Sequence, residues 1–193
     1  MGKTSNRSGE GLIKHTVVLL YSGGMDSTLL LKMALQMGEW PYCVIIDYEQ
    51  VHIKEIQAAE RMCVELGVEY QIVNIRDLNI GSNLTHKTQT YDGVSSWHVP
   101  ARNLMFLAIS ASIAESKKIK IIWYGANYED RENLFPDCYQ EWVHQLNILL
   151  SINGSMKIKV EAPLLGMSKE TISKLCELFK IDKNKIFSGY GTT

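Results

Sequence analysis

The chain has 193 residues, of which 46% are hydrophobic, and its formal net charge is −1. This length suits one domain with a sizeable buried core, and the near-neutral charge argues against a surface that binds a nucleic acid backbone. A small-molecule substrate is therefore expected, and the apolar runs are too short to cross a bilayer. The four cysteines form no C-x-x-C pair, which predicts reduced thiols in a cytoplasmic protein: Cys43, Cys63, Cys138 and Cys176.

Residues 1–14 are polar and contain glycine and serine, which predicts a flexible N-terminal arm before one domain at 15–193. Strand-like and helix-like segments then alternate, which predicts βαβ units, a parallel sheet and an α/β fold. Gly38 and Gly67 stand where glycine caps close helices, and Ser168 is expected to cap the last helix. Strands are expected at 16–21, 42–47, 69–75 and 119–124, and helices at about 27–38, 51–66, 101–117, 137–152 and 168–180.

The sequence between the first strand and the first helix is Ser22-Gly23-Gly24-Met25-Asp26-Ser27. Two glycines let the backbone turn tightly and approach a ligand, and the hydroxyls and N–H groups at a helix start attract an anion. Asp26 does not suit a phosphate, so we interpret it as a magnesium ligand. No Gly-Lys-Ser/Thr closes the turn, which excludes a Walker A loop. The turn resembles the PP-loop of ATP pyrophosphatases, which cut ATP between its α and β phosphates.

Three segments follow predicted strand ends: the turn at 22–27, Asp47 with Tyr48, and the stretch from Gly125 to Asp130. Ligands of open parallel sheets bind beyond the carboxyl ends of the strands, so these segments are expected to share one crevice. The predicted ATP and pyrophosphate contacts are Ser22, Gly23, Gly24, Met25, Asp26, Ser27, Asp47, Tyr48 and Gly125.

Residues 76–100 form a long polar connection with little apolar periodicity. Such loops are usually functional or disordered, and we favour a substrate lid over plain disorder.

Four further segments sharpen the prediction: Asp47 to Ile56, Val99-Pro100-Ala101-Arg102-Asn103, Phe135-Pro136-Asp137-Cys138 and Pro163 to Lys169. Together with the PP-loop, they resemble the 7-cyano-7-deazaguanine synthase family over about residues 16–190. The resemblance implies a Rossmann-like fold of the adenine nucleotide alpha hydrolase (HUP) type, with helices on both faces of the sheet. It also implies use of ATP and magnesium, and a homodimer. That family converts 7-carboxy-7-deazaguanine, ammonia and ATP into a nitrile, by way of an adenylated carboxylate and an amide.

Asp26, Arg102 and Lys169 are the predicted catalytic residues. Arg102 presents a planar fork that can hold phosphate oxygens or the acyl-phosphate, and the alternative is an exposed surface arginine. Lys169 stands at the start of a helix, where its charge is unfavourable unless an anion is near. It is therefore interpreted as a second phosphate contact, and the alternative is a solvated lysine.

The substrate contacts are implied by the resemblance. Gln50, His52 and Glu55 match the family pattern Q-x-H-x-x-E. A structural histidine and a capping glutamate are the alternatives for the last two. A purine-like base needs a carboxylate for its N–H edge and aromatic faces for stacking, although core packing is the alternative for Trp97, Tyr128 and Phe135. The predicted substrate-binding residues are Gln50, His52, Arg102, Asn103, Asp130, Phe135 and Asp137.

The chain departs from the family at two places. The family's zinc ion is held by four cysteines near the C-terminus, but here Gly189 replaces the first and the others have no counterpart. We therefore expect no zinc there. The substrate loop, DRENLFPDCY at 130–139, is one residue longer than the family's and lacks its Ser-Gly.

These departures leave the acceptor open. The leading hypothesis is nitrile formation from ammonia. The alternative stops at an amide, joining the deazaguanine to an amine of a protein or another molecule, and divergent relatives in bacterial antiviral defence fit that setting. A third hypothesis is a nucleotide-binding module without catalysis. The absence of a basic surface and of a glutaminase domain argues against tRNA thiolases and glutamine-fed amidotransferases.

Overall fold

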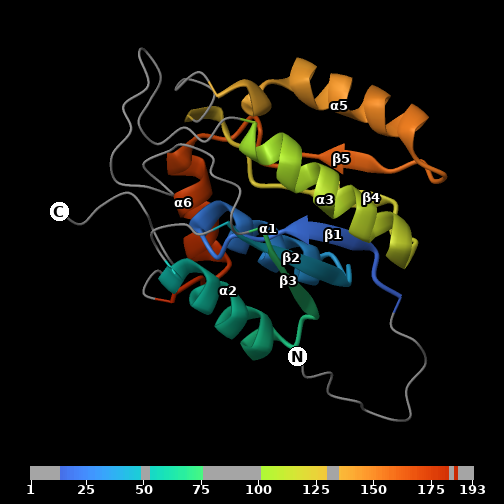
Figure 1. The fold of residues 1–193 in the computed structure, drawn as a ribbon. Helices are drawn as coiled ribbons and strands as arrows, with labels where there is room; N and C mark the ends of the chain where they lie inside the picture. Colours follow the sequence, from blue (N-terminus) through green and yellow to red (C-terminus); the bar gives the residue numbers. More distant parts are fainter. Residues whose placement is uncertain (1–13, 49–52, 76–100, 130–134, 183–184, 187–193) are drawn as a thin grey trace, which may run out of the picture.

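The computed structural model describes residues 14–48, 53–75, 101–129, 135–182 and 185–186 (Figure 1). Strands and helices alternate along the chain, as the sequence predicts. The strands are β1 (Val17–Leu20), β2 (Pro41–Asp47), β3 (Tyr70–Asn74), β4 (Ile121–Trp123) and β5 (Lys159–Glu161). The helices are α1 (Met25–Gln36), α2 (Ile53–Leu66), α3 (Arg102–Lys117), the 3-10 turn η1 (Pro136–Cys138), α5 (Gln140–Asn153) and α6 (Lys169–Leu178).

The five strands form one parallel sheet in the order β3-β2-β1-β4-β5. β1 lies in the middle, where Val18 pairs with Tyr42 of β2 on one side and with Ile122 of β4 on the other. The chain leaves β1 toward β2 and returns later to β4, so the strand order reverses between β1 and β4. The carboxyl ends of these two strands therefore border a crevice of the kind that binds ligands in open α/β sheets.

Both faces of the sheet are covered by helices, because side chains alternate across each strand. Val17, Leu19 and Tyr21 pack with α1, α2 and α6, whereas Val18 packs with α3 and α5 on the opposite face. Figure 1 shows α3 and α5 lying side by side on one flank of the sheet and α2 on the other. All seven residues of β2 are buried, which explains why this strand reads as a continuous apolar run.

The sequence predictions and the structure differ at a few places. α1 begins at Met25, two residues before the predicted start, because the polar turn itself forms the first helical turn. The helix predicted at 137–152 divides into η1 and α5. β5 was not predicted. It has only three residues, of which Val160 alone is buried, and so short a segment shows no recognisable strand periodicity. The predicted lid at 76–100 and residues 1–13 of the predicted arm lie outside the described residues.

Three helix ends are formed by the capping residues that the sequence predicts. Gly38 and Gly67 adopt φ values of +77° and +66° just after α1 and α2, as a glycine cap requires. Ser168 caps α6, with its hydroxyl accepting a hydrogen bond from the Thr171 N–H at 3.2 Å. All four cysteines are buried, and none of them forms a disulfide bond.

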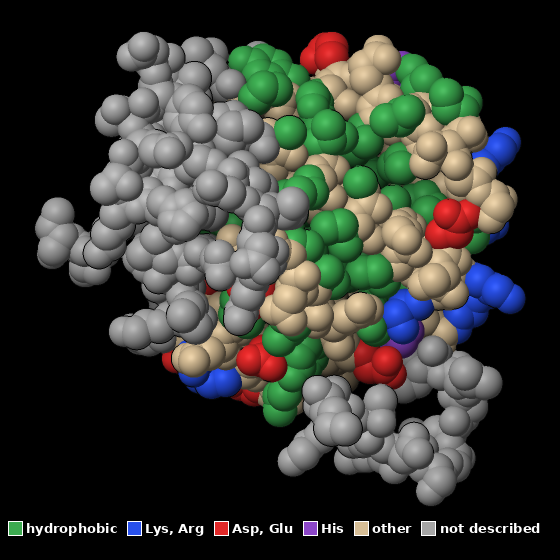
Figure 2. All heavy atoms as spheres, in the orientation of Figure 1, with side chains coloured by type: hydrophobic (Ala, Val, Ile, Leu, Met, Phe, Trp, Pro, Cys, Tyr) green, Lys and Arg blue, Asp and Glu red, His purple; other side chains and the backbone are tan. Residues whose placement is uncertain are grey.

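The outer surface carries apolar side chains on α5. Ile148, Leu149 and Ile152 are exposed there, and hydrophobic side chains are visible on the upper part of the face drawn in Figure 2. In the described part of the chain, no helix combines the length and the apolar character needed to span a membrane.

Candidate active site

The turn between β1 and α1 is held in shape by its own hydroxyls and by close packing. Gly23 has a φ of +79°, and a Cβ at this position would lie 2.9 Å from the Glu55 carbonyl oxygen and 3.0 Å from the Ala59 nitrogen. Only glycine fits this backbone and this contact without strain. The hydroxyls of Ser22 and Ser27 lie 3.0 Å apart. The turn therefore places the N-terminal end of α1 just beyond the carboxyl end of β1, beside the crevice, where helix N–H groups attract anions.

Asp26, in the first turn of α1, is a meeting point for three segments of the chain. Its Oδ2 atom accepts hydrogen bonds from Lys169 Nζ at 2.8 Å and from Asn127 Nδ2 at 3.0 Å. Its Oδ1 atom is buried and has no hydrogen-bond partner among the described residues. A buried carboxylate oxygen in this state fits a hard cation such as magnesium, which is consistent with the predicted ligand role.

The segment after β4 fixes the start of α6. A Cβ on Gly125 would lie 3.3 Å from both the Asp26 Cβ and the Ser27 nitrogen, so this segment packs directly on the turn. The backbone N–H of Lys169 donates to Glu129 Oε1 at 2.7 Å. The Tyr128 N–H donates to the Met167 carbonyl at 3.1 Å. These contacts place the Lys169 side chain against Asp26. The sequence alone predicted only that Lys169 lies at the start of a helix.

Arg102 opens α3 in a cluster with residues of β2 and α2. It follows Ala101, whose φ of 52° lies in the left-handed region that alanine rarely adopts. The positive charge of Arg102 lowers the pKa of Tyr48 and of Glu55, which opposes the effect of burial on both groups. Burial raises the pKa of Glu55 to about 6, and the nearby Arg102 opposes this rise. Burial also raises the pKa of Tyr48, whose ring packs 5.2 Å from that of Phe106.

Two predicted substrate contacts come together on the α3 and η1 side. The Asn103 Nδ2 group donates a hydrogen bond to Asp137 Oδ2. The Tyr124 hydroxyl, at the end of β4, donates to the Asp137 backbone carbonyl at 2.5 Å. Burial raises the pKa of this tyrosine, so it stays a neutral donor. Phe135 is partly buried and packs on the core cluster beside α3 and α5.

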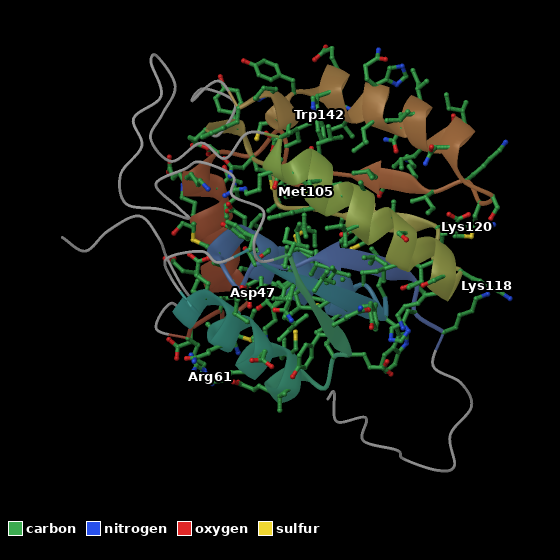
Figure 3. All side chains as sticks on the ribbon, viewed as in Figure 1. Asp47, Arg61, Met105, Lys118, Lys120 and Trp142 are labelled. Atoms are coloured by element: carbon green, nitrogen blue, oxygen red, sulfur yellow. The ribbon has the colours of Figure 1, made fainter. Side chains whose placement is uncertain are left out.

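The remaining predicted residues divide into two groups. Asp47 is buried at the carboxyl end of β2, where Figure 3 labels it, and its carbonyl accepts the Ile75 N–H at 2.8 Å. Gln50, His52, Trp97, Asp130 and Gly189 lie outside the described residues. Within the residues that the structure does describe, no group of three or more His, Cys, Asp or Glu side chains could hold a metal ion.

Sequence reasoning missed two members of the crevice, Asn127 and Glu129. Both lie in the stretch from Gly125 to Asp130, which the sequence had placed at a strand end, but neither residue was singled out. Asn127 is completely buried, so a polar side chain directly after a strand was the available signal.

Comparisons with known proteins agree with this picture. The sequence profile of a family described as "Queuosine biosynthesis protein QueC" matches residues 16–193. A 7-cyano-7-deazaguanine synthase from Psychromonas ingrahamii is 34% identical over 184 residues, covering 90% of this chain and 83% of the relative. The enzyme of the same name from Pseudoalteromonas translucida is 35% identical over 162 residues, covering 79% and 74%.

Solved structures of low identity share the fold. A U34-tRNA thiolase, NcsA, from Methanococcus maripaludis aligns with a TM-score of 0.62 at 18% identity, over 93% of this chain and 62% of that protein. An NH3-dependent NAD synthetase from Campylobacter jejuni aligns with a TM-score of 0.57 at 19% identity, over 94% and 71%. At such identities the likeness concerns the fold alone. The predicted Rossmann-like parallel sheet with its PP-loop after the first strand is confirmed.

Proposed function

The chain belongs to the QueC family of queuosine biosynthesis proteins, and from this premise we propose that it adenylates 7-carboxy-7-deazaguanine and passes the acyl group to ammonia. It is an enzyme of the carbon–nitrogen ligase class, like its relatives named 7-cyano-7-deazaguanine synthase. The observation that carries the proposal is the set of contacts at Asp26, where the PP-loop, the segment after β4 and the start of α6 meet at the first turn of α1.

The nucleotide half of the crevice suits ATP cleavage. The hydroxyls and N–H groups of the turn at 22–27 hold the pyrophosphate, and the Lys169 ammonium beside Asp26 offsets its charge. Asp26 would hold magnesium, which supplies a further cation to the phosphates when bound. Asp47, Tyr48 and Gly125, at the carboxyl ends of β2 and β4, complete the nucleotide contacts in this proposal.

The substrate half of the crevice suits a purine-like base that carries a carboxylate. Asp137, oriented by Asn103 and by the Tyr124 hydroxyl, offers an acceptor to the N–H edge of the base. Arg102 holds the phosphate of the acyl-adenylate with its planar fork. Gln50, His52, Asp130 and Phe135 are the further substrate contacts that the family pattern proposes.

The proposed reaction has three steps. A carboxylate oxygen attacks the α-phosphorus, and the bond between the α and β phosphates breaks with release of pyrophosphate. Ammonia then attacks the acyl carbon, and AMP leaves with loss of a proton to give the amide. A second activation with ATP converts the amide oxygen into a leaving group, and elimination gives the nitrile.

A second candidate stops at the amide. The substrate loop at 130–139 lacks the family's Ser-Gly and has a different residue in place of its final arginine, which favours an altered acceptor. In this alternative the acyl-adenylate is attacked by an amine of a protein or another molecule, in a setting such as antiviral defence. A non-catalytic nucleotide-binding module remains the alternative of another class.

Mass spectrometry separates these functions. The purified protein is incubated with magnesium-ATP, 7-carboxy-7-deazaguanine and ammonia, or with candidate protein acceptors. We expect AMP, pyrophosphate and a 7-cyano product. AMP together with a stable adduct on an acceptor amine would replace nitrile synthesis by conjugation, and no AMP at all would indicate the binding module. Lys169→Met serves as the impaired variant and Lys174→Met as its control, because Lys174 is on the same helix but pairs with Glu170 on the exposed surface.

A further inference from the structure

Lys169 stands at a place in its helix where a positive charge is unfavourable. It is the first residue of α6, directly after the cap residue Ser168, and the N-terminal end of a helix carries a partial positive charge. The Ser168 hydroxyl accepts the N–H of Thr171, so this cap serves a donor further along the helix. The N–H of Lys169 is held instead by a group from another part of the chain.

That group is the side chain of Glu129, in the segment after β4. Its Oε1 atom accepts the Lys169 N–H at 2.7 Å, across 40 residues of sequence. A carboxylate at a helix N-terminus satisfies a backbone donor and also offsets the partial positive charge of the helix. Glu129 therefore lowers the electrostatic cost of a lysine at the start of α6.

The segment that carries Glu129 also holds the partner of Lys169. Asn127 Nδ2 donates a hydrogen bond to Asp26 Oδ2 at 3.0 Å. The Tyr128 N–H donates to the carbonyl oxygen of Met167, just before the cap of α6, at 3.1 Å. These two bonds and the bond to the Lys169 N–H come from three consecutive residues. One short segment therefore holds both the PP-loop and the start of α6.

The hydrogen bond from Glu129 adds a constraint that apolar packing does not supply. Ile172 of α6 and Leu30 of α1 belong to one core cluster, and Figure 1 shows the two helices side by side. Burial of apolar surface is non-directional, whereas a hydrogen bond to one N–H fixes the position of one residue. The bond therefore sets where α6 begins, and with it the origin of the Lys169 side chain.

We propose that Glu129 is a positioning residue: it holds the Lys169 main chain so that the ammonium group, beside Asp26, reaches the phosphates of the bound nucleotide. In this role Glu129 acts through Lys169 and touches neither the nucleotide nor the metal. The inference rests on the proposed function, because it takes Lys169 as a phosphate contact.

The test is a double-mutant cycle read by binding, which needs no turnover. The affinity for magnesium α,β-methylene-ATP is measured by titration calorimetry in the wild type, Glu129→Met, Lys169→Met and the double variant. We expect Lys169→Met to weaken binding about tenfold and Glu129→Met about fivefold, with the double variant within about twofold of Lys169→Met alone. Additive losses would overturn the inference, because a merely structural role of Glu129 does not depend on the lysine side chain.

A conservative variant separates positioning from metal binding. Glu129→Gln keeps an oxygen that accepts the Lys169 N–H but loses the charge, so it should bind the analogue within about threefold of the wild type. A loss as large as that of Glu129→Met would overturn the inference and indicate a ligand of the metal. Glu170→Gln is the matched control, because Glu170 is an exposed carboxylate on the same helix that pairs with Lys174 at 2.6 Å. It should bind as the wild type does.

Thermal unfolding checks that each variant is folded. If Glu129→Met does not fold, Glu129→Asp takes its place in the cycle with the same expected coupling, because the shorter side chain does not reach the same N–H.

The proposed function fails separately. If the cycle shows the expected coupling but the wild type releases no pyrophosphate with 7-carboxy-7-deazaguanine, the acid is not the substrate and the role of Glu129 stands. If pyrophosphate is released but the cycle is additive, the proposed function stands and the role of Glu129 does not.

Discussion

At the scale of single residues, Asp26 and Lys169 show how a charge that is unfavourable locally becomes favourable in the folded chain. A lysine in the first turn of a helix opposes the helix dipole. Here its ammonium lies 2.8 Å from a carboxylate that comes from another helix. Lys169 is about one-third exposed and Asp26 about one-fifth, so the pair can still exchange partners when an anionic ligand enters.

Substitution of Lys169 by methionine should therefore affect catalysis more than stability. We expect the rate of pyrophosphate release to fall about a hundredfold, because a cation aimed at the phosphates is lost. The free energy of unfolding should fall by only about 1–2 kcal/mol, since a partly exposed ion pair contributes little. Release assays and urea denaturation measure the two effects. A variant that keeps wild-type release would remove Lys169 from the proposed mechanism, and Lys174→Met is the control on the same helix.

The residue types of the site could be read from the sequence, but several partners could not. Ser22, Asp26 and Ser27 belong to one contiguous motif, so this motif can be recognised from the sequence. The Asp26 partners, Asn127 and Lys169, lie 101 and 143 residues away along the chain. No local periodicity records such a contact, so these residues could be placed after a strand and at a helix start from the sequence, but their pairing with Asp26 could not be predicted.

At the scale of secondary-structure elements, the packing of α2 on the PP-loop depends on one glycine. Two effects act at Gly23: its φ of +79° is unfavourable for other residues, and a Cβ would approach two backbone atoms of α2 within 2.9–3.0 Å. Gly38 has a similar φ of +77° but no atom within 4 Å of a Cβ built on it. Comparison of the two glycines therefore distinguishes the cost of a positive φ, which both share, from the cost of a steric clash with α2, which only Gly23 would have.

Substitution of each glycine by alanine tests this distinction. We expect Gly38→Ala to lower the free energy of unfolding by about 1–2 kcal/mol, the cost of a left-handed conformation. Gly23→Ala should cost about 1–3 kcal/mol more, because either the loop or α2 must shift. Denaturant titrations give both values. Equal losses in the two variants would mean that the approach of α2 to the loop is readily relaxed.

The boundaries of the elements followed from local chemistry to within a few residues. Glycines closed α1 and α2, and Ser168 capped α6, because caps are interactions between near neighbours in sequence. β5 was missed for the opposite reason: its three residues become a strand through pairing with β4, and Val160 lies opposite Ile122 in that register.

At the scale of the whole molecule, the crevice exists because the sheet has its reversal of strand order between β1 and β4. The two core clusters on opposite faces hold the helices that carry the site residues. A ligand that binds across these segments joins parts of the structure that are distant in sequence, so its binding should stabilise the native state as a unit.

Thermal unfolding measures this linkage. Magnesium-ATP at about one hundred times its dissociation constant should raise the free energy of unfolding by about 2.7 kcal/mol, and so raise the melting temperature by several degrees. Asp26→Asn should lose most of this shift, because the amide is a poorer partner for both the cation and Lys169. Asp182→Asn, at an exposed position beyond α6, should keep the shift. A full shift in Asp26→Asn would show that nucleotide binding does not depend on this carboxylate.

By itself, the sequence determined the alternation of strands and helices, the phosphate turn and the family resemblance, because each of these resides in residues that are adjacent or regularly spaced. The tertiary structure alone decided that Asp26 meets Lys169 and Asn127, and that Asn103 meets Asp137. These pairs depend on the order of strands in the sheet and on how closely helices pack upon it. Such contacts arise from the burial of the whole apolar core, and no short stretch of sequence specifies them.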